Sequence, residues 1–384
     1  MEHLIHPQVK NIAISGIRQM ANRVAQYKDV LSLTIGQPDF PTPPHIVEAA
    51  CRAAMEGHTV YTPNAGLLPL REAACAFMEA KYGLSYRAAD EAIVTVGASQ
   101  AIDVTLRTIL EPGCEVVLPG PVYPGYEPIV RMCGAVPVYV DVTENGFKLT
   151  AELLEPALTE RTRCVILASP SNPTGVALER EELAALARLL AEREVFVISD
   201  EIYSELVYDF AHASISAFPG MRERTIVVNG LSKSHSMTGW RIGFVFAPAA
   251  IAQHILKVHQ YNVTCASSVS QHAAIEALTA GADDAAPMRE AYRERRDFAY
   301  TRLREIGFDV VKPEGAFYLF PSVRKFGLDS TAFSLSLLDQ ERVAVVPGSA
   351  FTSYGEGFVR LSYGCSSDTL REALDRLERF VGGL

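Results

Sequence analysis

The sequence predicts an α/β protein in which helices cover both faces of a mostly parallel sheet, followed by a smaller α+β domain. Through the middle of the chain, short continuous apolar runs alternate with stretches of helical periodicity, a pattern typical of parallel strands buried on both faces. Toward the C-terminus strands and helices alternate, which indicates the smaller α+β domain. The chain has 384 residues, of which 48% are hydrophobic, and this length suffices for two domains with a large core.

The composition argues against several classes of protein. The formal net charge is −10 and no basic run offsets it, so neither nucleic acid nor an anionic membrane surface is an expected partner. The 7 cysteines include no CxxC pair, which favours reduced thiols in a cytoplasmic protein. No signal-like or membrane-spanning apolar run is found. The histidines lack the spacing of metal ligands, so no metal is expected.

The N-terminal part is predicted to be a surface helix followed by a strand and a rigid crossing. Apolar residues between Met1 and Tyr27 recur on one helical face, and Val30–Ile35 has the composition of a strand. The Pro-rich segment Gly36–Pro44 suits either a ligand-binding loop or a plain link between domains. A helix is expected over Pro44–Glu56.

The middle of the chain supplies the strands and helices of the expected sheet. Each strand is a short apolar or β-branched run, and the helices show apolar residues at helical spacing or are rich in Leu, Ala and Glu. Strands are expected at residues 92–96, 116–118, 136–142, 164–168, 195–199 and 225–228. Helices are expected after the turn at 97–100, with a stop at 111–113, and at 150–158 and 179–192.

The C-terminal part is expected to begin with helices and to end in an alternation of strands and helices. Two helices with a polar break at 262–268 are predicted between 251 and 281. Arg360 lies within a predicted strand between apolar neighbours, as an ordinary edge-strand arginine or a ligand-binding one would. Further helices are expected at 283–305, 330–338 and 367–381, and strands at 307–311, 315–320, 343–347 and 357–362.

Polar side chains follow three of the predicted strands directly. Asn172, Asp200 and Lys233 would therefore meet at one edge of a parallel sheet, where such sheets bind ligands. Asp200 ends an apolar run, and burial of its carboxylate is costly unless it meets a cation or caps a helix. Lys233 is followed by Arg241. A lysine amine can condense with an aldehyde and an arginine can hold a phosphate, so the pair suggests a phosphorylated aldehyde cofactor.

Two further segments could contact such a cofactor. The small-residue turn Gly97–Gln100 precedes a helix, and the free N–H groups of the first helical turn form an anion site. Ser99 in that turn could equally be only a helix cap. Tyr123 lies in a loop stiffened by proline and glycine, which could present its ring flat against a planar ligand or pack it in the core.

Three motifs together indicate a family. The string TIVVNGLSKSHSMTGWRIG spans residues 225–243, SNPTG spans 171–175 and DEIY spans 200–203. In this order and spacing they resemble the class I aminotransferases of fold type I, which use pyridoxal phosphate. The resemblance covers Gly36 to Ser362 by motifs. It implies three parts. Residues 1–35 form an N-terminal segment and part of the small domain, residues 36–285 form a large cofactor-binding domain, and residues 286–384 form the rest of the small domain.

The resemblance implies a role for each residue that matches a family motif. Lys233 would bind the cofactor aldehyde, Asp200 would face the pyridine nitrogen and Tyr123 would stack on the ring. The side chains that would hold the phosphate are Ser99, Ser232 and Arg241, and those that would bond the phenolic oxygen are Asn172 and Tyr203. Gly230 departs from subgroups that have a phosphate-binding serine there, which puts cofactor affinity in doubt.

The resemblance also implies how substrate and partner would bind. Arg360 would clamp the substrate α-carboxylate, helped by Asn172 and by the backbone N–H of Gly36. Tyr61, in the loop YTPNAG, would reach the cofactor phosphate of a neighbouring subunit, so a homodimer is expected, although a tyrosine packed within its own loop is the commoner case. His235 is expected to be a packing residue because Lys233 carries the proton in this family.

The expected reaction is transamination between an L-amino acid and a 2-oxo acid, with 2-oxoglutarate as the expected acceptor. The SGIR start, the YTPNAG loop and the GLSKSHSMTGWRIGF string are similar to bacillary aminotransferases considered to act on N-acetyl-diaminopimelate in lysine synthesis. Two alternatives stay open: a carbon–sulfur β-lyase of the cystathionine type on the same scaffold, and a cofactor-sensing regulator. A regulator would need a basic DNA-binding segment ahead of Gly36, and the residues there are too few and not basic enough.

Overall fold

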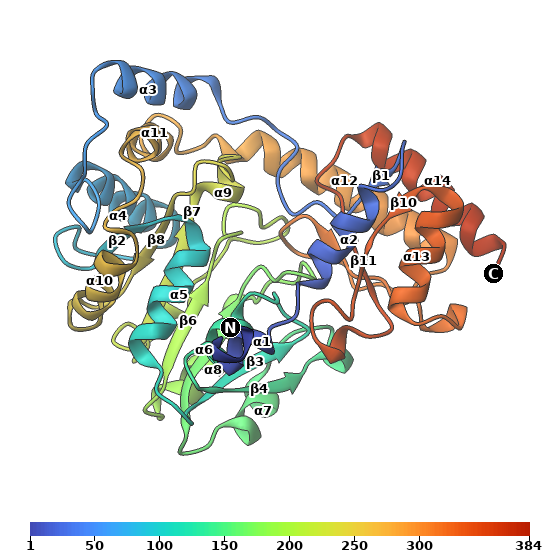
Figure 1. The fold of residues 1–384 in the computed structure, drawn as a ribbon, viewed down its shortest axis with the longest axis horizontal. Helices are drawn as coiled ribbons and strands as arrows, with labels where there is room; N and C mark the ends of the chain where they lie inside the picture. Colours follow the sequence, from blue (N-terminus) through green and yellow to red (C-terminus); the bar gives the residue numbers. More distant parts are fainter.

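The computed structural model describes residues 1–384 and is built around a seven-stranded sheet with strand order β2-β8-β7-β6-β5-β3-β4 (Figure 1). β3 through β7 run parallel to one another, and β8 is antiparallel to both of its neighbours, β2 and β7. The strands are β2 (Ala92–Thr95), β3 (Glu115–Gly120), β4 (Val136–Asp141), β5 (Thr162–Ala168), β6 (Phe196–Asp200), β7 (Thr225–Gly230) and β8 (Gly243–Phe246).

Neighbouring residues of a strand pack into the cores on opposite sides of the sheet, because side chains alternate between the two faces. Val116 and Ile166 pack under α5 and α10, whereas Val117 and Val165 belong to the core beneath α8 on the other face. These strands are apolar on both faces, as a sheet covered by helices requires. The covering helices are α5 (Gly97–Ile109), α6 (Tyr126–Met132) and α10 (Ala249–Val263) on one face, and α7 (Ala151–Leu154) and α8 (Arg180–Ala191) on the other.

A third group of helices covers the β2 and β8 end of the sheet. Helix α11 packs against α3 and α4, and their apolar residues share a core with Val94, Val227 and Phe244. The group consists of α3 (Pro44–Met55), α4 (Leu68–Tyr82) and α11 (Ser268–Leu278). Short α9 (Leu231–Ser234) follows β7 at the same end.

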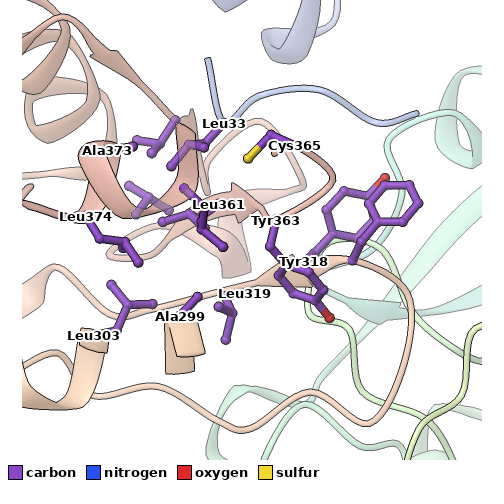
Figure 2. Packing of buried hydrophobic residues seen from close by; sticks show 14 of the residues in the cluster. Leu33, Ala299, Leu303, Tyr318, Leu319, Leu361, Tyr363, Cys365, Ala373 and Leu374 are labelled. Atoms are coloured by element: carbon purple, nitrogen blue, oxygen red, sulfur yellow. The ribbon is translucent and has the colours of Figure 1, made fainter. Parts of the chain in front are cut away.

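The C-terminal part has its own core of 26 buried residues, part of which is drawn in Figure 2. Leu319 and Leu361 from two paired strands meet Leu303 and Leu374 from two helices there. The antiparallel sheet has the order β11-β12-β9, and β1 pairs in parallel with β10. The elements are α12 (Ala285–Ile306), α13 (Ser330–Glu341), α14 (Ser367–Gly382), β1 (Leu31–Ser32), β9 (Tyr318–Leu319), β10 (Val343–Ala344), β11 (Val346–Pro347) and β12 (Val359–Ser362).

The N-terminal segment runs between the two parts of the molecule (Figure 1). Helix α1 (Pro7–Lys10) contacts α6 beside the large sheet, and α2 (Gly16–Val24) contacts β11 of the C-terminal part. Short 3-10 helices complete the chain: η1 (Glu2–Leu4), η2 (Thr143–Asn145), η3 (Glu155–Ala157), η4 (Ile215–Ala217), η5 (Arg324–Phe326) and η6 (Ser353–Gly355).

Most of the predicted elements are present, and several predictions were wrong in extent. Residues 307–311 form no strand: Phe308 is buried in the C-terminal core and Asp309 makes only an isolated bridge to Ser322. The strand predicted at 30–35 is reduced to β1, and the helix at 150–158 divides into α7 and η3. β8, α4 and α6 were not predicted.

Candidate active site

Ten of the predicted site residues line one cavity of about 950 Å³. The cavity includes residues at or just beyond the carboxyl ends of β5, β6 and β7, together with residues of α2, α5, β9 and β12. A parallel sheet therefore gathers the three strand-end side chains as the sequence predicted. The ten residues are Gly36, Ser99, Tyr123, Asn172, Asp200, Tyr203, Ser232, Lys233, Arg241 and Arg360.

Lys233 extends into this cavity from α9, directly after β7. Its amine donates a hydrogen bond to the backbone carbonyl of Gly36. Burial, together with the positive charges of Arg360 and Arg241, lowers the pKa of the Lys233 amine to about 8. A substantial fraction of this amine is therefore neutral and nucleophilic near physiological pH.

Asp200 ends β6 and is buried beside the cavity. The hydroxyl of Tyr126 donates to its Oδ2 at 2.6 Å, and the backbone N–H of Ile202 donates to Oδ1 at 3.2 Å. Burial raises the pKa of Asp200, while these two donors lower it. Tyr126 lines the cavity and was missed by the sequence analysis, although it stands three residues after Tyr123 in the same Pro- and Gly-rich loop.

The Arg241 guanidinium lies beside the start of α5. The guanidinium of Arg241 donates to the Thr238 carbonyl at 3.0 Å and approaches Gly97, at which an added Cβ would lie 2.4 Å from Nη2. Gly97 has φ +75°, a left-handed conformation that favours glycine. Ser99 and Ser232 line the same cavity. The N-terminus of a helix beside an arginine fork attracts a phosphate through both its N–H groups and its dipole.

Tyr123 presents an aromatic ring to the cavity. Its ring packs edge-on against Tyr126, with centroids 5.4 Å apart and an angle of 80° between the planes. The absence of a side chain at Gly125 leaves room for this ring, because a Cβ there would lie 2.3 Å from Tyr123 Cε1. Burial raises the pKa of the Tyr123 hydroxyl, so this side chain is neutral at physiological pH.

Arg360 is almost fully buried in β12, the central strand of its sheet, so the edge-strand interpretation was wrong. Its Nη1 donates to Asn172 Oδ1 at 2.9 Å and its Nη2 to the Thr34 carbonyl at 2.8 Å. Its Nε is buried without a hydrogen-bond partner. The guanidinium stacks on the rings of Tyr318, at 4.4 Å, and Phe351, at 4.9 Å. A desolvated fork with a free donor is suited to binding a carboxylate.

The remaining predicted residues fall in three different environments. The Tyr203 hydroxyl is in the cavity wall and shares a hydrogen bond of 2.8 Å with the hydroxyl of Tyr318. His235 is buried outside the lining, between Ser234 Oγ and the Gly281 carbonyl. Tyr61 is not in the cavity at all, and 84% of its surface is exposed.

The cavity wall also contains residues to which the sequence analysis gave no role. Helix α2 contributes Ile17, Arg18, Ala21 and Asn22, and β9 contributes Tyr318. The helical periodicity of the N-terminal segment predicted a helix but gave no signal for which of its faces meets a ligand. No helix in the structure is both long and apolar enough to cross a membrane.

Known proteins match this chain over nearly its full length. A family model described as aminotransferase class I and II matches residues 28–377. A probable N-acetyl-LL-diaminopimelate aminotransferase of Bacillus subtilis (strain 168) is 62% identical over 381 residues, which cover 99% of this chain and 96% of the relative. An aspartate aminotransferase of Pyrococcus abyssi (strain GE5 / Orsay) is 44% identical over 371 residues, covering 96% and 95% of the two chains.

The structure agrees with these sequence matches. The N-succinyldiaminopimelate aminotransferase of Mycobacterium tuberculosis superposes with a TM-score of 0.93 at 35% identity, covering 98% of this chain and 99% of the other. These proteins are named as aminotransferases. The carbon–sulfur lyase and the cofactor-sensing regulator that the sequence left open are therefore not favoured.

Proposed function

Because the chain belongs to the class I and II aminotransferase family, we propose that it transfers an amino group between N-acetyl-L,L-diaminopimelate and 2-oxoglutarate. It is an aminotransferase that depends on pyridoxal phosphate. The proposal rests on one observation: an amine with a lowered pKa, a buried carboxylate and two arginines line the same cavity. The choice of donor is supported by the name of the Bacillus subtilis relative.

The residues of the cavity fit pyridoxal phosphate. Gly97 and Gly243 pack so closely that a Cβ on Gly243 would lie 2.5 Å from the Gly97 carbonyl carbon, which brings Arg241 against the start of α5. That pairing suits a phosphate dianion. Asp200 has hydroxyl and amide donors but no ion-pair partner, and a protonated ring nitrogen would supply one. Tyr123 would cover the ring, and Asn172 and Tyr203 would bond its phenolic oxygen.

Lys233 would transfer the α-proton of the substrate. When bound, pyridoxal phosphate supplies an electron-accepting ring that acidifies the α-proton of the amino acid joined to it. The Lys233 amine, with its pKa lowered to about 8, is the group that would accept that proton and hold it for return. Asp200, whose carboxylate is held in place by two donors, would face the ring nitrogen.

Arg360 would orient the substrate. Its position beneath two aromatic rings fixes the guanidinium before substrate arrives, so little side-chain entropy is lost on binding. The unpartnered Nε and the Nη1 that now bonds Asn172 are the donors available to an α-carboxylate. The Gly36 backbone N–H lies on the same cavity wall and would add a donor.

The active unit is proposed to be a cytoplasmic homodimer in which Tyr61 completes the neighbouring site. Val60, Tyr61 and Tyr261 are 75%, 84% and 88% exposed. Asn64 joins their two segments by donating to the Thr264 carbonyl at 2.8 Å. Large apolar side chains exposed together favour a protein interface. Because Tyr61 lies outside the cavity of its own chain, any contact with a bound cofactor would be made in another copy. Each subunit is proposed to divide at the predicted boundaries, 36–285 and 286–384, with 1–35 joining the smaller part.

A mixing experiment tests the dimer. Subunits with Lys233→Ala and subunits with Tyr61→Ala are combined by denaturation and refolding, and activity is measured at limiting cofactor. If Tyr61 acts across the interface, each mixed dimer contains one site with both native residues, and about a quarter of wild-type activity returns. If Tyr61 acts within its own chain, no site has both residues and nothing returns.

A donor panel tests the substrate. With 2-oxoglutarate as acceptor, kcat/KM is measured for N-acetyl-L,L-diaminopimelate, aspartate, phenylalanine and cystathionine. The proposal predicts that the acetylated diamino acid gives the highest value. A higher value for aspartate or phenylalanine would make the chain a general aminotransferase, and release of pyruvate from cystathionine without an acceptor would make it a lyase.

A further inference from the structure

The cavity has more cations than the cofactor and the substrate α-carboxylate account for. Its lining includes four basic side chains, Arg18, Lys233, Arg241 and Arg360, and a single carboxylate, Asp200. Arg241 belongs to the phosphate end beside α5, and Arg360 has the buried fork for an α-carboxylate. Arg18 has no carboxylate within ion-pair distance and no hydrogen-bond partner in the structure.

Helix α2 is held at a defined place on the C-terminal part. Gly16 approaches Ala350 so closely that a Cβ on the glycine would lie 2.6 Å from the Ala350 Cβ. One turn later, Met20 is buried in a small core with Leu338 and Ala344. The polar side chains of this segment that line the cavity, Ser15, Arg18 and Asn22, are spaced at i, i+3 and i+7. They therefore form one face of the helix, distinct from the face that includes Met20.

The same packing places α2, the helix that contains Arg18, beside the strand that pairs with Arg360. Ile17, the neighbour of Arg18, packs against the core that contains Val346 and Phe351. Val346 pairs with Arg360 between adjacent strands, and the Phe351 ring lies 4.9 Å from the Arg360 guanidinium. Helix α2 and the Arg360 clamp are thus supported by one group of residues, whereas Arg241 lies in the turn before β8 of the large sheet.

We propose that Arg18 binds a second carboxylate, the one at the far end of the substrate, while Arg360 binds the α-carboxylate. The substrate class is then an amino acid or oxo acid with two carboxylates separated by methylene groups, for which the apolar lining residues Ile12, Ile17 and Ile35 provide the intervening wall. An arginine is suited to such a group because its fork forms two charge-assisted hydrogen bonds. The assignment rests on the proposed function, whose donor and acceptor are both dicarboxylic.

Binding without turnover gives the most direct test. The cofactor-loaded protein is titrated calorimetrically with glutarate and with valerate, which have equal chain lengths and differ in the second carboxylate. Arg18→Gln is expected to weaken the binding of glutarate roughly 10- to 100-fold, the range for loss of a charge-assisted hydrogen-bonded pair. The binding of valerate should weaken less than twofold. Arg18→Lys, which keeps the charge, is expected to recover part of the loss.

The matched control is Arg23→Gln, because Arg23 lies on the same helix, interacts with Tyr27 and Gln26, and does not line the cavity. It should change neither titration. The half-reactions of glutamate and of glutamine supply the kinetic counterpart, and only the glutamate rate constant should fall in Arg18→Gln.

The outcomes separate this assignment from the proposed function. If the wild-type protein binds glutarate no better than valerate, the dicarboxylic substrates themselves are wrong. If the wild type prefers glutarate and Arg18→Gln keeps that preference, the substrates stand and the role of Arg18 is overturned. An equal loss for glutarate and valerate would also overturn it, because it would indicate a displaced helix and not a lost anion contact.

Discussion

At the scale of single residues, the Lys233 amine is placed among like charges in a buried cavity. Burial contributes most to the lowering of its pKa, followed by Arg360 and Arg241, and Asp200 acts in the opposite direction. The neutral amine is the form that attacks an aldehyde. A protein without cofactor should therefore capture pyridoxal phosphate faster as the pH rises through about 8, because the amine loses its proton there.

Stopped-flow absorbance at constant ionic strength, from pH 6.5 to 9.5, measures this rate. Arg360→Gln removes a positive charge that lowers the Lys233 pKa, so its midpoint should move to higher pH. The control, Arg23→Gln, should keep the wild-type midpoint. A midpoint near 10.5, the ordinary value for lysine, would contradict the desolvated site.

The Tyr126 hydroxyl provides a second test at this scale. Tyr126→Phe leaves one oxygen of the buried Asp200 without its donor, which should cost about 1–3 kcal/mol of unfolding free energy. It should also raise the pKa of Asp200, since this hydrogen bond lowers it, and reduce kcat roughly tenfold. Tyr139→Phe is the matched control, because it loses a 2.6 Å bond to Glu127 outside the cavity. Equal kcat for the two variants would show that Asp200 does not depend on Tyr126.

The sequence predicted site residues that lie in motifs better than site residues whose roles depend on contacts between separate elements. Asn172, Asp200 and Lys233 were predictable because each follows a strand whose type and direction the apolar pattern indicates. Tyr126 and Tyr318 were not, because their roles depend on which hydroxyl faces which across separate elements. The predicted contacts of Ser99 and Tyr61 with a phosphate stay predictions.

At the scale of elements, the close approach of β8 to the start of α5 forms the anion site. Gly97→Ala should therefore cost more than backbone strain, because the new Cβ would meet the Arg241 guanidinium at 2.4 Å. We expect cofactor affinity, measured by fluorescence titration, to fall at least about tenfold as Arg241 is displaced.

A Gly83→Ala variant separates the effect of backbone strain from the effect of displacing Arg241. Gly83 has a similar φ of +68° and nothing within 4 Å of an added Cβ, so this variant carries only the strain, about 1 kcal/mol. Its melting temperature should fall while cofactor affinity stays unchanged. If both variants bind cofactor like the wild type, the β8–α5 contact does not organise the phosphate site.

The predictability of an element depended on what stabilises it. The long amphipathic helices α8 and α14 and the apolar strands β5 and β7 were predicted because their local pattern matches their burial. β8 was missed since its four residues are a strand only by pairing antiparallel between β2 and β7. Phe308 was wrongly assigned to a strand because the C-terminal core buries it without a partner strand.

At the scale of the whole molecule, the cavity lies where the large sheet, the N-terminal segment and the C-terminal sheet meet. Lys233 follows β7 of the large sheet, Arg18 comes from the N-terminal segment and Arg360 from the C-terminal sheet. No single motif contains the complete site. The joint arrangement was predictable only through the family resemblance, whereas the packing of α2 against β11 required the structure.

Lys233→Ala tests whether fold and chemistry can be separated at this scale. Lys233 lines the cavity and its amine donates to a backbone carbonyl, so its truncation should leave the far-ultraviolet circular dichroism spectrum unchanged. Turnover should fall at least roughly 10³-fold, because the amine provides both attachment and proton transfer. Retention of appreciable turnover would remove Lys233 from the reaction.

A single-turnover half-reaction tests the assignment of aminotransferase chemistry to the Lys233 site most directly. The cofactor-loaded protein is mixed with N-acetyl-L,L-diaminopimelate or glutamate without any oxo acid, and oxo acid, ammonia and cofactor are quantified by rapid quench and mass spectrometry. We predict one oxo acid formed per site, conversion of the cofactor to its amine form, no ammonia, and no reaction in Lys233→Ala. Continued release of ammonia without an acceptor, or an equal yield from Lys233→Ala, would contradict transamination at this site.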